Sequence, residues 1–109
     1  MLGDVEDIDN QLNIKMFQFG YVTQQTVFSG GFDAIVGLAY PTMAEDSVEP
    51  FFDAMMREKI LQNNVFAFYM SMNPIKDDSE LTFGFYNEER YVPDTLKWHP
   101  VIDKLFWSL

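Results

Sequence analysis

The sequence predicts a mainly β domain with one short helix near residues 50–61. Several short segments alternate apolar and polar residues, as strands with one buried face do. Gly, Pro, Asn and Asp separate these segments at turn positions. A single segment, 50–61, repeats its apolar residues at helical spacing. The 109 residues suit one domain at most, and a hydrophobic content of 48% with 17% aromatics provides enough material for a core.

Three strands are predicted before the helix. Residues 12–19 alternate apolar and polar side chains at their start and end, and residues 21–28 are rich in Thr, Val and aromatics. Residues 32–41 are nearly all apolar, which indicates a strand buried on both faces. Asp33 is the exception in that run. Because a buried carboxylate needs partners, we expect Asp33 to be a hydrogen-bonded structural residue.

The predicted helix starts at Pro50, since proline suits the first helical turn, where its missing N–H would be unpaired anyway. It should end near Leu61. Its apolar residues recur at helical spacing: Phe51, Phe52, Met55, Met56 and Ile60. This stripe favours packing against a core over a groove for a partner.

The second half of the chain returns to strand patterns. Residues 65–70, 81–86 and 95–101 are strand candidates, and 73–79 reads as a turn. Residues 105–109 begin a further apolar strand. A packed β domain seldom stops inside such a strand, so we expect a truncated fold.

The composition excludes several classes of function. Seventeen acidic residues against seven basic ones give a net charge of −10, which disfavours binding to nucleic acid or to anionic membranes. The charge is either an ordinary solvated surface or an adaptation to an acidic compartment. Without cysteine there can be no disulfide and no thiolate nucleophile. No apolar run is long enough to span a membrane.

The common catalytic and metal motifs are also missing. The lone histidine, His99, lies in a predicted strand, and no serine has a Gly-x-Ser-x-Gly context. The acidic run at 77–80 lacks the spacing of an EF-hand loop, and the glycine pair at 30–31 lacks that of a phosphate-binding loop. We therefore predict no metal and no cofactor.

Residues 32–41, Phe-Asp-Ala-Ile-Val-Gly-Leu-Ala-Tyr-Pro, take the interpretation further. They resemble the Phe-Asp-Gly-Ile-Leu-Gly-Leu-Ala-Tyr-Pro stretch of pepsin-like aspartic proteases, the peptidase A1 family. Other blocks resemble that family in the same order: 17–20, 50–56, 65–71, 80–84, 96–101 and 106–107. Ala34 and Phe85 depart from it, each replacing a usual glycine. The resemblance spans roughly residues 12–109.

The resemblance implies a central piece of a bilobal enzyme. Residues 1–109 would be a partial domain, truncated at both ends, within the N-terminal lobe and up to the strand between the lobes. Such enzymes are aspartic endopeptidases that hydrolyse peptide bonds with two aspartates, each in an Asp-Thr/Ser-Gly turn. No such turn occurs here, because Asp94-Thr95 and Asp46-Ser47 are followed by Leu96 and Val48.

We therefore predict that the isolated chain is inactive and that the missing flanking segments of the same protein hold both catalytic turns. The alternative is a peptidase-like binding module, or a gene remnant, that does not cut peptides. A third possibility is that the isolated chain has no stable fold. The family implies a secreted, lysosomal or vacuolar location.

The resemblance also implies where a peptide or protein substrate would bind. Phe32 and Ile35 match positions that line hydrophobic pockets on the N-terminal side of the cleaved bond. Phe28 matches another aromatic there, and Phe106 matches a wall position on the leaving-group side. The alternative for all four side chains is plain core packing.

Overall fold

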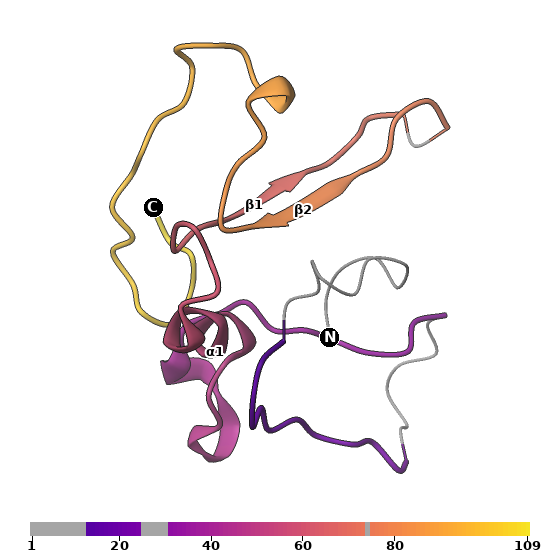
Figure 1. The fold of residues 1–109 in the computed structure, drawn as a ribbon, viewed down its shortest axis with the longest axis vertical. Coiled ribbons are helices and arrows are strands. Elements are labelled where there is room, and N and C mark those ends of the chain that lie inside the picture. Colours follow the sequence, from indigo (N-terminus) through magenta and orange to yellow (C-terminus); the bar gives the residue numbers. More distant parts are fainter. Residues whose placement is uncertain (1–12, 25–30, 74) are drawn as a thin grey trace. The chain divides into compact units, whose positions relative to one another are not determined.

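The computed structural model describes residues 13–24, 31–73 and 75–109. Within them lie one α-helix, α1 (Phe51–Glu58), and a two-stranded antiparallel sheet of β1 (Phe66–Tyr69) and β2 (Glu80–Phe83), with turns and extended chain between them (Figure 1). Short 3-10 helices occur at Pro41–Met43, Glu45–Ser47 and Glu88–Arg90. The described residues thus hold one short α-helix, one small sheet and much extended chain, which confirms the predicted fold class.

The chain divides into two compact units. Unit 1 comprises Met1–Glu58 and Val101–Leu109, and unit 2 comprises Lys59–Pro100. Helix α1 belongs to unit 1, and the β1–β2 hairpin belongs to unit 2. No helix among the described residues is long and apolar enough to cross a membrane.

Helix α1 follows directly from its sequence. The amide of Ala54 donates to the carbonyl of Pro50 at 3.0 Å, so the first turn forms right after the proline. Asp53 in the first turn and Arg57 in the last turn both suit the helix dipole. Lys59 adopts a left-handed φ of 54°, which stops the helix at Glu58, short of the predicted end near Leu61.

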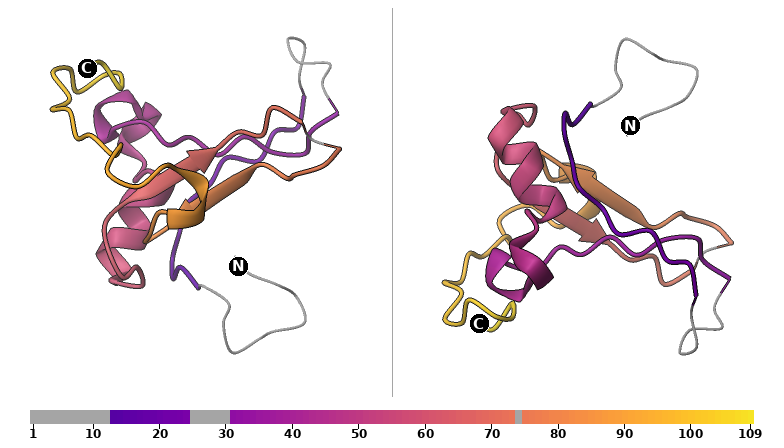
Figure 2. Two further views of the ribbon diagram at one scale, coloured as in Figure 1. Left: turned by 90° about the horizontal axis from the view of Figure 1, so that it is seen from above. Right: turned by 90° about the horizontal axis from the view of Figure 1, so that it is seen from below.

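Segments distant in sequence meet inside unit 1. The rings of Phe17 and Phe51 pack edge to face with centroids 5.8 Å apart. Near the C-terminus, the indole N–H of Trp107 donates to the carbonyl of Leu38 at 3.1 Å, and its ring lies 4.6 Å from that of Tyr40. In both views of Figure 2 the yellow C-terminal segment accordingly lies beside the magenta 3-10 turns.

The hairpin is the most regular part of unit 2. Its register pairs Phe66 with Phe83 and Phe68 with Leu81, which places these four apolar side chains on one face. The amide of Gly84 donates to the carbonyl of Val65 at 2.8 Å and extends the ladder by one step.

Four of the predicted strands do not form. Residues 13–19, 32–41, 95–101 and 105–109 are extended chain or turns without strand pairing, and residues 25–28 of the predicted strand at 21–28 lie outside the described part. The run at 32–41 is not buried on both faces, because most of its residues are exposed. A strand needs a neighbour for its backbone N–H and C=O groups, and none pairs with these segments in the described residues.

Candidate functional site

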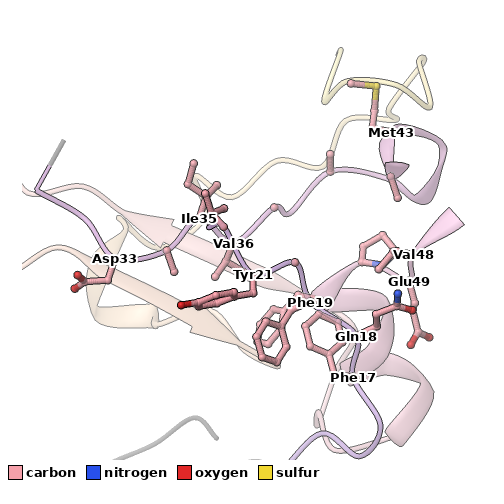
Figure 3. Close-up of a pocket in the computed structure, with 18 of the residues that line it drawn as sticks. Phe17, Gln18, Phe19, Tyr21, Asp33, Ile35, Val36, Met43, Val48 and Glu49 are labelled. Atoms are coloured by element: carbon pink, nitrogen blue, oxygen red, sulfur yellow. The ribbon is translucent and has the colours of Figure 1, made fainter. Parts of the chain in front are cut away.

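A hollow in unit 1 has a volume of about 1020 Å³. Two segments line it, one at residues 17–24 and the other at residues 32–51 (Figure 3). Most of the lining is aromatic or aliphatic and includes Phe17, Phe19, Tyr21, Phe32, Ile35 and Val36. An apolar hollow of this size can take up apolar groups of a ligand.

Two carboxylates also line the hollow, Asp33 and Glu49, and Figure 3 shows them far apart along its length. The Nε of Arg57 donates to both Glu49 oxygens, at 3.0 and 3.1 Å. These hydrogen bonds, followed by one to Glu58, raise the pKa of Arg57. Arg57 thus balances the charge of Glu49 locally.

The prediction that Asp33 is a buried structural carboxylate is wrong, because its side chain is exposed. Asp33 lies at one end of the hollow (Figure 3). The exposure follows from the missing strand pairing of residues 32–41, which leaves this stretch open to solvent.

Helix α1 carries one acidic side chain in its first turn, Asp53. Partial burial, and then the charge of Glu49, raise the pKa of Asp53. The charge of Glu49 therefore makes ionisation of Asp53 less favourable.

The structure brings together two of the four predicted substrate-contact residues. Phe32 and Ile35 both line the hollow, with 48% and 70% of their surfaces exposed. Phe106 is 59% exposed in the C-terminal segment of unit 1 and does not line the hollow. Phe28 lies outside the described residues.

Sequence reasoning did not single out Phe17, Phe19 and Tyr21 as site residues, although all three line the hollow. Phe17 and Phe19 were assigned to a predicted strand and to the family-like block at 17–20, and Tyr21 was assigned to the next predicted strand. Their spacing of two residues was the available signal, since it puts successive side chains on one side of an extended segment.

The described residues contain no cluster of three or more His, Cys, Asp or Glu side chains that could hold a metal ion. His99 is exposed and belongs to unit 2. The lining of the hollow is mostly aromatic or aliphatic, which favours the binding of apolar groups.

A comparison with known families gives this hollow a context. The sequence model of the eukaryotic aspartyl proteases matches residues 5–109. The chain belongs to the eukaryotic aspartyl protease family. The resemblance drawn from the ordered blocks is thereby confirmed.

Curated relatives of this aspartyl protease chain agree with the assignment. It is 39% identical to cathepsin E of Cavia porcellus over 95 residues, covering 84% of this chain and 24% of the relative. It is 34% identical to cathepsin D of Gallus gallus over 102 residues, 90% of this chain and 25% of the relative. It is also 37% identical to embryonic pepsinogen of Gallus gallus over 78 residues, which cover 72% of this chain and 20% of the relative. The chain thus spans about a quarter of the length of these relatives.

Proposed function

We propose that this chain supplies part of the substrate-binding wall of an aspartic endopeptidase. Membership of the aspartyl protease family supports the reaction class. The observation that carries the proposal is the apolar hollow of unit 1, because Phe32 and Ile35 line it and belong to the block that most closely resembles the family.

In the proposed enzyme, the chemistry belongs to two aspartates outside residues 1–109. Two adjacent carboxylates share one proton, since both cannot ionise cheaply. One takes a proton from a bound water as that water attacks the peptide carbonyl, and the other donates a hydrogen bond to the carbonyl oxygen. The present chain would hold the side chains that flank the cleaved bond and fix its position.

Phe32 and Ile35 are proposed to contact the substrate on the N-terminal side of the cleaved bond. Phe28 is proposed to contact the substrate on the same side, and Phe106 to contact it on the leaving-group side. Both assignments rest on the family resemblance alone. The exposure of Ile35 supports the first assignment, because a side chain that meets a substrate must be accessible in the free protein.

An Ile35→Ala variant tests the assignment in the protein that joins residues 1–109 to both catalytic turns. Removing this apolar contact should lower kcat/KM roughly tenfold for peptides with a large apolar residue at the adjoining position. For peptides with alanine at that position, kcat/KM should fall less. Ile102→Ala is the matched control, because Ile102 is exposed but does not line the hollow. An equal loss for both peptides, or for both variants, would contradict the assignment.

The second candidate is a peptidase-like binding module that does not cut. The observation that favours it is the lack of any Asp-Thr-Gly or Asp-Ser-Gly in the 109 residues. Sequencing of the native transcript and the mass of the endogenous protein separate the two. A reading frame that runs into such turns on both sides supports the endopeptidase, and a native protein of 109 residues supports the binding module.

A further inference from the structure

Arg90 in unit 2 is the centre of a cluster that joins four parts of the chain. Its Nη1 donates to both oxygens of Asp77 at 3.0 Å, and its Nε donates to Oε2 of Glu80 at 3.2 Å. The guanidinium carbon lies 4.4 Å from the ring centroid of Tyr69, over its face. Through Arg90 the 3-10 helix Glu88–Arg90 is therefore joined to the end of β1, to the loop after it and to the start of β2.

The partners of Arg90 are themselves held in place. The hydroxyl of Tyr69 donates to Oδ2 of Asp77 at 2.7 Å, so this carboxylate has a second donor besides Arg90. The amide nitrogen of Asn87 lies 3.3 Å from Oε1 of Glu80 and can donate to it. The side-chain oxygen of Asn87 accepts from the amide of Glu89 at 3.0 Å, which caps the 3-10 helix that ends in Arg90.

Among the described residues of the loop between β1 and β2, Asp77 is the one whose side chain bonds to the 3-10 helix Glu88–Arg90. The loop's apolar side chains Met70, Met72 and Ile75 are almost entirely exposed, so burial contributes little stability there. Its own hydrogen bonds are local, such as those from the amides of Lys76 and Asp77 to the carbonyl of Asn73. Asp77 is the loop residue through which Arg90 and Tyr69 anchor it.

We propose that Arg90, Asp77, Glu80 and Tyr69 form an acid-releasable clasp. At neutral pH the clasp holds residues 75–79 of the loop against the 3-10 helix Glu88–Arg90 through Asp77. Protonation of Asp77 removes the charge that Arg90 binds and frees the loop. The structure thus places a pH-dependent conformational change at the tip of the hairpin.

The direction of the pH dependence follows from the bonds to Asp77. The hydrogen bond from Tyr69, and then that from Arg90, lower the pKa of Asp77 below its usual 3.8. A carboxyl with a lowered pKa stabilises the folded arrangement above its unfolded pKa, and the contribution is lost as the pH falls through the folded value. The clasp should therefore stay closed through mildly acidic pH and open only in stronger acid.

Other charged groups lie near the clasp and bear on its titration. Glu80 faces Asp77 across Arg90, and the remaining neighbours in sequence are Lys76 and Asp78 in the loop and Glu88 and Glu89 in the 3-10 helix. Asp78 is exposed and none of the clasp hydrogen bonds involves its side chain, so it provides a matched control.

Hydrogen exchange of the full chain tests the clasp. After correction for intrinsic rates, protection of the Lys76 and Asp77 amides should fall roughly threefold between about pH 5.5 and pH 2.5. Asp77→Asn should show the low value already at the higher pH, and Asp78→Asn should follow the wild type. Wild-type protection that does not change with pH, or an Asp77→Asn variant as protected as the wild type, would overturn the proposal.

A milder variant keeps the test decisive if Asp77→Asn does not fold. Tyr69→Phe removes one hydrogen bond from the Asp77 carboxylate and leaves the aromatic ring under Arg90. The pKa of Asp77 should then rise, so the loop should open at a higher pH than in the wild type. The opening midpoint is read from the same two amides, and a midpoint that does not move rules the clasp out.

Discussion

At the scale of single residues, side-chain type and surroundings can disagree. Asp33 sits in an apolar run and was expected to be buried, yet it is exposed at one end of the hollow. Met55 was expected on the apolar face of the helix and is fully buried. The two cases differ because the helix fixes which side Met55 faces, whereas the exposure of Asp33 depends on a neighbouring strand.

Met55→Ala is predicted to destabilise the fold by about 2–5 kcal/mol, because it removes a fully buried side chain and leaves a cavity. Met72→Ala is the matched control. Its side chain is fully exposed, so the change should stay within about 0.5 kcal/mol. Urea unfolding followed by circular dichroism measures both values. Similar losses in the two variants would mean that Met55 is not a core residue.

At the scale of elements, the sequence pattern predicted those helices and strands whose hydrogen-bond partners lie close by in the chain. Helix α1 and the hairpin of β1 and β2 lie inside or very close to their predicted ranges. The hairpin needs only a partner a few residues away, which its own turn supplies. The boundary errors come from backbone conformation, since Lys59 and Gly84 both have positive φ and turn the chain.

Gly84→Ala is predicted to weaken the end of the hairpin by about 1–2 kcal/mol, because Gly84 has a φ of +88° that disfavours any side chain. An added Cβ would also lie 3.3 Å from the amide nitrogen of Gln62. Gly37→Ala is the control, since its Cβ would meet nothing within 4 Å. Hydrogen exchange at Val65 and Gly84 reports the effect, and equal protection in both variants would refute this role for Gly84.

At the scale of the whole molecule, the 109 residues belong to a protease family and lack the Asp-Thr/Ser-Gly turns on which the proposed reaction depends. The chain belongs to the eukaryotic aspartyl proteases and contains no Asp-Thr-Gly or Asp-Ser-Gly. A single carboxylate cannot replace the dyad, because the mechanism needs one ionised and one protonated group side by side.

The 109-residue chain alone is therefore predicted not to cleave peptides at any pH. The assay uses a fluorogenic apolar peptide from acidic to neutral pH, with and without pepstatin. The pepstatin arm distinguishes aspartic protease activity from a contaminating protease. Turnover that pepstatin abolishes, and that copurifies with the chain, would show that these residues catalyse by themselves.

The sequence by itself determined the family, the helix, the hairpin and the lack of catalytic turns. Each of these depends either on residues close together in the chain or on the order of the family-like blocks. Among the residues that line the hollow, the sequence predicted Phe32 and Ile35 as site residues but did not predict Phe17, Phe19 and Tyr21.

Only the tertiary structure decided which segments share the hollow, where Asp33 lies, and that Arg90 binds Asp77 and Glu80. These contacts join residues ten or more positions apart. Local propensity carries no information about such distances, since they depend on how turns bring the elements together.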